Sequence, residues 1–412
     1  MAATDTTSRA QRLPILFIMI TMVIDAMGIG LIMPVMPELI QEVSAGALGQ
    51  AAIWGGILAS SFAVMQFLFA PMLGRLSDAY GRRPILLVSL IVMAADYVVM
   101  GLAGSVWILL LARIIGGITA ATHSTALAYM ADISDGSEKA KRFGLIGAAF
   151  GLGFVLGPGL GGLLAEFGTR APFYMAAALA FANAIFGWVV LPETVTEKTR
   201  RAFRLRGGNP LSAFVSLSQM PMIRPLTMVY FLYQLATMVY PAVWAYFATE
   251  RFGWSPGMIG VSLMLYGIGA AVVQGVLVGP VIARLGQRGA VMFGLTIEVV
   301  IFGVLGFISS GTITLILTPL MALGNVGLPA LQGIIAQKTP DDSQGEMQGV
   351  LSSISSIAMI MGPLVLTQIF AWATRDDGPI YLPGAPFLLS GILMTVAVLL
   401  FVNQAPKRSA AV

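Results

Sequence analysis

The sequence has 412 residues, of which 57% are hydrophobic and only 10% are charged, with a formal net charge of +4. A soluble domain is usually about 25% charged, so this composition excludes a soluble enzyme, a nucleic-acid-binding protein and a disordered chain. The absence of Cys and the single His exclude disulfides, thiol catalysis, a Cys-ligated zinc site and a His-rich metal site.

Long apolar stretches recur along the whole sequence. A helix that crosses a membrane needs about 20 apolar residues, whereas strands of a membrane barrel are about ten residues long and alternate in polarity. The continuous runs therefore predict an all-α polytopic membrane protein, and the first run lacks the small-residue cleavage site of a signal peptide. The twelve predicted spans are residues 14–36, 51–73, 84–104, 107–130, 143–165, 171–191, 225–248, 256–280, 289–310, 312–336, 346–371 and 384–403.

Lys and Arg are distributed unequally between the loops on the two sides of these spans. With both termini placed in the cytoplasm, nearly all of the 23 Lys and Arg residues fall in cytoplasmic segments. The opposite loops hold only Arg170, Arg251 and Arg375, and Arg113 lies within a span. This asymmetry is the positive-inside pattern expected in a bacterial inner membrane. Topology thus explains the net charge, and no nucleic-acid partner is needed.

The longest polar stretch divides the predicted spans into six and six. It covers residues 192–224 and is rich in Arg, so we predict a cytoplasmic linker between an N-terminal half, residues 1–191, and a C-terminal half, residues 225–412. Two halves of this kind are a known transporter plan, with the substrate site between them near the middle of the membrane. Two motifs recur at a nearly constant spacing and favour a duplication: Gln66, Pro71 and Arg75 as Gln274, Pro280 and Arg284, and Gly157-Pro158 as Gly362-Pro363.

The loop after the second span combines glycines with charged side chains. Asp78 could pair with Arg82 or Arg83, or approach the positive end of a neighbouring helix. Such a contact would close the cytoplasmic side of a transporter, and the alternative is a loop that only obeys the positive-inside rule. The loop resembles the signature of the major facilitator superfamily, although Ala79 stands where that family usually has a basic residue. The candidate gate residues are Gly74, Ser77, Asp78, Gly81, Arg82 and Arg83.

The fifth span is rich in glycine and contains a Gly-Pro pair. Small residues let helices approach closely, and proline bends a helix. Ordinary tight packing is one interpretation. Within the superfamily, however, residues 153–162 are similar to the motif associated with antiporters. The motif residues are Gly153, Gly157, Pro158, Gly161 and Gly162.

Four ionisable residues, Asp25, Asp96, Arg113 and Glu298, lie within predicted spans. A charge at membrane depth is costly and usually faces a cavity or a partner. A carboxyl in apolar surroundings can bind and release a proton, so we predict that the three acids take part in transport. Asp25 could instead form a static pair with Arg113, which is either a structural partner or a coupling residue. No acid stands with Ser or His at a hydrolase-like spacing, so the sequence predicts no enzyme.

The remaining polar residues of the spans leave two questions open. His123 could titrate and carry a proton, but a neutral His bonded to a neighbouring helix is the favoured interpretation. Other polar and aromatic residues could line a drug-sized pocket, or could hold helices together and anchor them at the membrane surface. The candidate substrate-binding residues are Gln66, Tyr230, Tyr233, Gln234, Tyr266, Gln274, Asn325 and Gln332.

A more specific resemblance runs through residues 25–37, 69–84, 147–162, 250–254, 328–333 and 345–349. These stretches resemble the tetracycline/proton antiporters, which exchange a tetracycline–divalent-metal chelate for a proton. The resemblance implies roles for Asp25 and Asp96 in substrate passage or coupling, for Ser77 and Asp78 in the gate, and for Gln66 in the substrate path. It also matches Glu298 to an acidic residue of span nine and Arg113 to an intramembrane Arg.

The sequence departs from that family at two positions. A His in span eight of familiar members falls at Ala270 here, and His123 replaces a small residue.

The function predicted from the sequence is a proton-driven drug antiporter that works by alternating access. Its substrate would be a small-molecule drug with a divalent metal accompanying it, no cofactor would be bound, and no Walker motif suggests ATP. The alternatives are an exporter of another drug or metabolite, a proton symporter on the same scaffold, and a membrane protein that transports nothing. A passive scaffold would gain nothing from the cost of buried acids.

Overall fold

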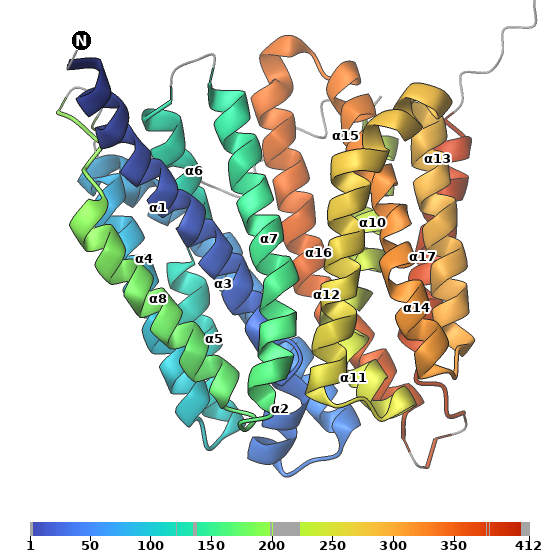
Figure 1. Cartoon of the computed structure of the whole chain (residues 1–412). Helices are drawn as coiled ribbons and strands as arrows, with labels where there is room; N and C mark the ends of the chain where they lie inside the picture. Colours follow the sequence, from blue (N-terminus) through green and yellow to red (C-terminus); the bar gives the residue numbers. More distant parts are fainter. Residues whose placement is uncertain are drawn as a thin grey trace, which may run out of the picture. The chain divides into compact units, whose positions relative to one another are not determined.

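The computed structural model describes residues 3–120, 122–134, 138–197, 200, 223–375, 377–378 and 380–404. Over these ranges the chain forms helices and contains no strand (Figure 1). Most of the predicted linker, residues 198–199 and 201–222, lies outside the described residues.

Eleven helical stretches of the described chain are long and apolar enough to cross a membrane. The longest has 52 residues and contains Gly286 with a positive φ of 70° and non-helical backbone. It has room for two crossings of about 20 residues. Predicted span eight, 256–280, falls within it, and predicted span nine, 289–310, does so except for its last three residues. The stretches are Leu13–Ile32, Leu48–Tyr80, Arg82–Leu102, Val106–Asp132, Lys141–Ala165, Ala171–Val190, Arg224–Phe252, Pro256–Phe307, Gly311–Lys338, Asp341–Ala373 and Ala385–Val402.

The predicted all-α membrane fold is therefore confirmed, with one local difference. The segment 281–288, expected to connect two spans, is helical on both sides of Gly286. A glycine adopts positive φ without a Cβ clash, so one residue is enough to redirect the chain there.

The helices group into two units. Unit one comprises Met1–Ala45, Ser61–Gly208 and Ser255–Met264, and unit two comprises Gly46–Ser60, Asn209–Trp254 and Leu265–Val412. Helices α3 (Leu48–Tyr80) and α12 (Pro256–Val272) thus contribute a part to each unit.

Unit one is built around α1. This helix packs against α7 and α8, and α4 packs against α5, α6 and α8 (Figure 1). Its core includes Phe17 and Met22 of α1 and Tyr129 of α6, all of which are fully buried. Besides parts of α3 and α12, unit one contains α1 (Ala3–Ile32), α2 (Met36–Ser44), α4 (Arg82–Leu102), α5 (Val106–Thr119), α6 (Thr122–Asp132), α7 (Lys139–Ala165) and α8 (Ala171–Val190).

In unit two, α13 packs against α15 and α17, and α10 packs against α16 and α17. The helices are α10 (Arg224–Thr237), α11 (Val239–Phe252), the π-helix η1 (Val273–Leu277), α13 (Val278–Phe307), α14 (Gly311–Met321), the 3₁₀ helix η2 (Ala322–Val326), α15 (Gly327–Lys338), the 3₁₀ helix η3 (Asp341–Ser343), α16 (Gln344–Ala373) and α17 (Ala385–Val402).

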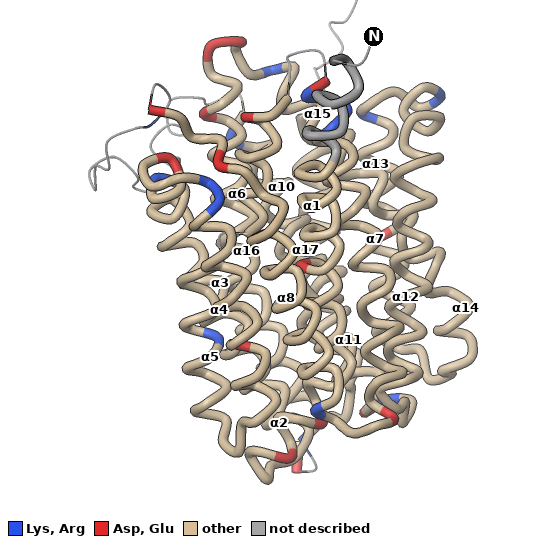
Figure 2. The backbone as a smooth tube through the Cα atoms, turned by 60° about the vertical axis from the view of Figure 1, so that its left-hand side comes forward, with Lys and Arg blue, Asp and Glu red and all other residues tan. Residues whose placement is uncertain are grey.

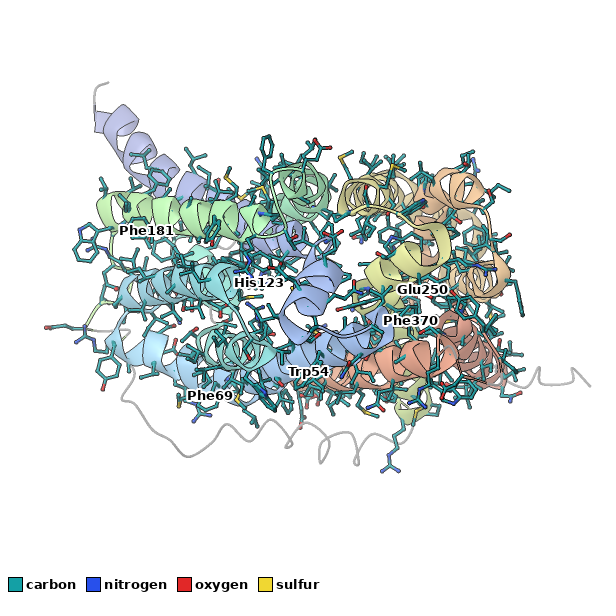
Figure 3. The ribbon with its side chains drawn as sticks, turned by 90° about the horizontal axis from the view of Figure 1, so that it is seen from below. Trp54, Phe69, His123, Phe181, Glu250 and Phe370 are labelled. Atoms are coloured by element: carbon teal, nitrogen blue, oxygen red, sulfur yellow. The ribbon has the colours of Figure 1, made fainter. Side chains whose placement is uncertain are left out.

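The outer faces of the helices are apolar. Phe181, Trp188 and Val189 of α8 are exposed, and Figure 3 shows Phe181 at the outer edge of its unit. Lys, Arg, Asp and Glu gather near the helix ends, and few lie midway along the helices (Figure 2). Large exposed apolar surfaces mark interaction with lipid or protein, and here they cover the parts of the helices that cross a membrane.

Two membrane-length stretches of unit two are interrupted near their middle. Met238 separates α10 from α11. Pro241 has no N–H to donate to the carbonyl of Thr237 four residues earlier, so it favours a break at this point. In the second stretch, η2 separates α14 from α15, and Pro329 likewise leaves the carbonyl of Asn325 without a helical donor.

Candidate functional site

The glycines of the fifth span bring α7 into backbone contact with α1. A Cβ added at Gly157 would lie 2.6 Å from the carbonyl oxygen of Met27 and 2.9 Å from Cα of Gly30. Gly153 and Gly161, one turn before and after, also face the α1 backbone at contact distance. Larger side chains would therefore push the two helices apart.

Another face of α7 meets the first part of α12, within unit one. A Cβ at Gly162 would lie 2.8 Å from the carbonyl oxygen of Pro256 and 3.0 Å from Cα of Gly257. The carbonyl of Pro158 similarly contacts Gly260. The residues of the predicted antiporter motif thus form two close helix contacts.

Asp25 lies on the part of α1 that faces this glycine stripe. Its side chain is half-buried, and it forms no ion pair or hydrogen bond with another described residue. The hydroxyl of Tyr97 on α4 packs against Gly28, about one turn from Asp25. Asp25 is therefore an intramembrane acid without a cation beside it.

Asp96 and Arg113 form a buried ion pair between α4 and α5. The same Arg113 nitrogen lies 2.7 Å from the sulfur of Met100, and the guanidinium stacks over the ring of Phe62 at 5.2 Å. The second oxygen of Asp96 has no partner among the described residues. Arg113 therefore pairs with Asp96, and the Asp25–Arg113 pair considered above is not formed.

His123 and Gln66 are less constrained. Figure 3 shows His123 on α6, where its exposed ring stands edge-on to Phe150 of α7, with the ring centroids 5.5 Å apart. The favoured hydrogen bond to a neighbouring helix is not formed with any described residue. Gln66 is half-buried on α3 and likewise makes no hydrogen bond in the described part of the chain.

Arg82 is the centre of a polar cluster where α3 turns into α4. Its Nη1 lies 2.6 Å from Oδ1 of Asp78 and 2.6 Å from Oγ of Ser77, while its Nε lies 3.1 Å from Oδ2 of Asp132. Gly81 has a φ of 114°, which a residue with a side chain rarely adopts. Of the partners predicted for Asp78, Arg82 is the one that it contacts. We call Ser77, Asp78, Arg82, Asp132 and Glu193 the Arg82 cluster.

Glu193, just beyond α8, caps the start of α4. Its two carboxylate oxygens accept hydrogen bonds from the backbone N–H of Arg82 at 2.9 Å and of Arg83 at 3.2 Å. An anion is favoured at the positive end of a helix. The side chain of Arg83 donates to the carbonyl oxygen of Trp188 at 2.6 Å. Gly74, by contrast, faces open space.

Sequence reasoning missed Glu193 and Asp132. Each lies far along the chain from Arg82, and each stands at the end of a predicted span, where a charged residue is ordinary. One signal for them was present in the sequence, which is that Glu193 and Asp132 fall on the predicted cytoplasmic side, together with the Arg-rich loops.

Glu298 lies at the centre of unit two with no exposed surface. Its Oε2 accepts a hydrogen bond of 3.1 Å from the hydroxyl of Tyr240, and its Oε1 has no partner among the described residues. On the other side, a Cβ at Gly324 of η2 would overlap the Glu298 carboxyl. No salt bridge within the described ranges involves Glu298.

Four of the predicted pocket residues form polar contacts in unit two, together with one residue that was not predicted. The hydroxyl of Tyr230 and the amide of Gln234 each lie 2.9 Å from Oγ of Ser355 on α16. The amide nitrogen of Asn325 donates to the hydroxyl of Tyr266 at 3.3 Å. These contacts join helices to one another, which is the second of the two roles considered for this set.

Three other predicted pocket residues take no part in these hydrogen bonds. Tyr233 is buried, Gln332 is half-buried and Gln274 is exposed on η1. A cavity of about 370 Å³ opens beside α13 and α14, but none of the predicted residues lines it. Its wall is almost wholly apolar and consists of Thr296, Ile297, Val300, Ile301, Val304, Leu305, Leu317, Leu320, Met321 and Leu323.

A resident metal site is not evident in the described residues, since no group of three or more His, Asp or Glu side chains could hold an ion there. A metal that accompanies a substrate would belong to the substrate.

The comparisons with known proteins agree with this architecture. Residues 18–238 and 226–412 match the Major Facilitator Superfamily. This chain belongs to the major facilitator superfamily. It therefore groups with transporters rather than with enzymes.

Among its relatives, the chain is 40% identical to "Tetracycline resistance protein, class C" of Escherichia coli, over 90% of this chain and 93% of that protein. It is 37% identical to "Tetracycline resistance protein, class G" of Vibrio anguillarum, over 88% and 92%. The crystal structure of the human organic anion transporter MFSD10 (TETRAN) superimposes with a TM-score of 0.68 at 25% identity, over 95% of this chain and 99% of that one. The resemblance to tetracycline resistance proteins is thus confirmed over nearly the whole chain.

Proposed function

We propose that this protein exports a tetracycline, chelated with a divalent metal, in exchange for protons. The chain lies in a bacterial inner membrane with both termini in the cytoplasm, and its two six-helix halves, residues 1–191 and 225–412, alternate access. The similarity to tetracycline resistance proteins supports the choice of cargo, and the distribution of Lys and Arg supports the orientation.

One observation carries the proton-coupling part of this proposal. Asp25 and Glu298 are intramembrane acids that form no ion pair with a cation of the described residues, whereas Asp96 is paired with Arg113. An ionised carboxylate at membrane depth without a partner is costly, so each of these groups is suited to gain and lose a proton during a cycle. Asp96 and Arg113 are assigned to positioning α4 and α5.

The Arg82 cluster is assigned to the cytoplasmic gate. In unit one it joins α3, α4, α6 and the segment after α8 through charged contacts. These contacts lie at a helix end, where water can replace them, so the cluster can break and reform as the transporter switches. Gly153, Gly157 and Gly161 of α7, the glycine stripe, would support the same switch, because a helix face without side chains lets α1 shift along it.

The direct test is a drug-susceptibility panel in a pump-deficient bacterial host. Expression should raise tolerance to tetracycline and lower its accumulation. Unchanged tolerance with verified membrane expression would refute the cargo and leave the fold intact. If another compound class responds instead, the departures at Ala270 and His123 mark where cargo and coupling have diverged from the relatives.

Proton coupling is tested in inverted membrane vesicles. Asp25→Asn and Glu298→Gln should abolish tetracycline-driven proton release, while His123→Ala should retain it. If both acid variants keep uptake driven by a pH gradient and His123→Ala loses it, the coupling group is the histidine.

A further inference from the structure

The environment of Glu298 is unusual because two residues in contact with its carboxyl, Tyr240 and Gly324, lie at helix interruptions. Tyr240, which donates to Oε2 at 3.1 Å, is the second residue of α11, directly after the break at Met238. Gly324, whose added Cβ would overlap the carboxyl, belongs to η2. The Glu298 carboxyl therefore lies between the α10–α11 break and the α14–α15 break.

Both interruptions leave backbone groups outside the regular helical ladder. Pro241 has no N–H to donate to the carbonyl oxygen of Thr237, so this acceptor lacks its helical partner at the α10–α11 break. A 3₁₀ stretch and a proline break are points where a helix bends easily. A group that contacts both points can influence the bend of two membrane helices at once.

The ring of Tyr240 is held independently of its hydroxyl. It packs against Tyr266, Phe302 and Phe387 with centroid separations of 5.4, 5.5 and 6.4 Å. Removing the hydroxyl alone would thus keep these ring contacts and delete only the donor to Glu298.

We propose that Tyr240 is a positioning residue for Glu298, and that its hydroxyl links the protonation of this carboxyl to the α10–α11 break. When Glu298 is ionised, Tyr240 donates to it and ties the first turn of α11 to α13. When Glu298 carries a proton, this charge-assisted bond weakens, and the hold on α11 is loosened. The inference rests on the proposed role of Glu298 in proton coupling.

The other groups near Glu298 allow a matched control. Tyr266 and Tyr233 are close enough to interact with it electrostatically, and no Lys or Arg in the described part of the chain pairs with it. The Tyr266 hydroxyl contacts Asn325 and not Glu298. Tyr266→Phe therefore removes a hydroxyl from the same aromatic cluster without deleting a hydrogen bond to the carboxyl.

The experiment measures the pH dependence of uptake of tetracycline with Mg²⁺ in inverted vesicles. Tyr240→Phe should move the profile upward by roughly 0.5 to 1 pH unit, because the charged carboxylate loses a donor. Tyr266→Phe should leave it in place. A Tyr240→Phe profile that superimposes on the wild type, or an equal shift in Tyr266→Phe, would overturn the inference.

Glu298→Gln separates this inference from the proposed function. If Glu298→Gln keeps coupled uptake, both the coupling role and the positioning role are wrong. If it abolishes coupling while Tyr240→Phe behaves as the wild type, only the positioning role is wrong.

A second measurement needs no drug, so it tests the inference even if the protein transports a cargo other than tetracycline. The unfolding temperature of purified protein is recorded against pH for the wild type and Glu298→Gln, and their difference reports the titration of Glu298. Tyr240→Phe should shift this difference curve and Tyr266→Phe should not. Gly324→Ala should disturb it as well, whereas Gly303→Ala, which adds a Cβ in open space on α13, should not. An unshifted curve in Tyr240→Phe would again refute the inference.

Discussion

The contact between α1 and α7 can be tested by a pair of glycine substitutions on α7. Gly157→Ala places a methyl group 2.6 Å from a carbonyl oxygen and 2.9 Å from a Cα atom of α1. Gly151→Ala places the same methyl group where no atom lies within 4 Å. Both substitutions gain the same helix propensity of about 1 kcal/mol, so their difference isolates the contact with α1.

The expected magnitude follows from these distances. Nonbonded carbon atoms pack best at about 3.5–4.0 Å, so α1 and α7 would have to separate by roughly 1 Å near Gly157. Overpacking of this kind costs about 1–3 kcal/mol. A balanced equilibrium between two transporter states would shift by about ten-fold for each 1.4 kcal/mol that falls on one state.

The assay combines the unfolding temperature of purified protein with tetracycline uptake in inverted vesicles. Gly157→Ala should unfold at a lower temperature than Gly151→Ala and transport several-fold more slowly. Gly151→Ala should transport like the wild type and unfold at the wild-type temperature or slightly above it, because it gains helix propensity without a clash. If the two variants behave alike in both measurements, the close contact does not limit stability or transport. The proposed role of the α7 glycines in switching is then refuted.

Three further predictions concern charged contacts. Asp78→Asn should keep the protein in the membrane but strongly reduce drug efflux, since Arg82 loses a charge-assisted contact of about 1.5–3 kcal/mol. The control Glu138→Gln, which breaks the exposed pair with Arg142, should transport normally. Equal drug accumulation in the two variants would contradict the role of Asp78 in a gate. Glu193→Gln should lower the unfolding temperature, because the start of α4 loses about 1 kcal/mol of stabilisation from the cap. Glu197→Gln is the neutral control. If the two variants are equally stable, the cap does not contribute to stability. Asp96→Asn and Arg113→Met should each reduce the amount of folded protein, because a broken buried pair costs about 3–5 kcal/mol. The double variant should recover part of the lost folded protein. Normal expression of either single variant would refute a positioning role for the pair.

Hydropathy predicted the spans closely because the membrane imposes their length. Every backbone polar group in hydrocarbon must be bonded within the segment, so an apolar run of about 20 residues has few structures open to it. The difference at 281–288 arose because polar residues there are compatible with a helical end as well as with a loop. The positive φ of Gly286 is a local backbone property that hydropathy does not report.

Contacts in the candidate site were predictable only where they are local. Asp78 and Arg82 are four residues apart on adjoining helical turns, so their pairing follows from the loop sequence. The caps and bridges from Glu193 and Asp132 depend on how α6 and the end of α8 approach α4, which is a matter of packing. Similarly, Ser355 of α16 was not among the predicted site residues, although its hydroxyl accepts a hydrogen bond from Gln234 of α10. The six-and-six division and the gate remain predictions.

The unequal pairing of the intramembrane acids bears directly on mechanism. A structural acid gains stability from a permanent cation, as Asp96 does from Arg113. A coupling acid needs the opposite, because a fixed cation would hold it ionised and prevent proton uptake at ordinary gradients. Asp25 lies beside the glycine stripe of α7, and Glu298 lies between two helix breaks, so each unpaired acid is placed where the backbone can move. Adding a cation beside the acid should therefore be more damaging than adding a neutral group at the same position. Gly324→Lys, which would bring an ammonium toward Glu298, should block proton exchange more completely than Gly324→Ala, which adds a Cβ at the same place without a charge. Retained coupling in Gly324→Lys, with the protein folded, would show that Glu298 does not need to lose and regain its charge.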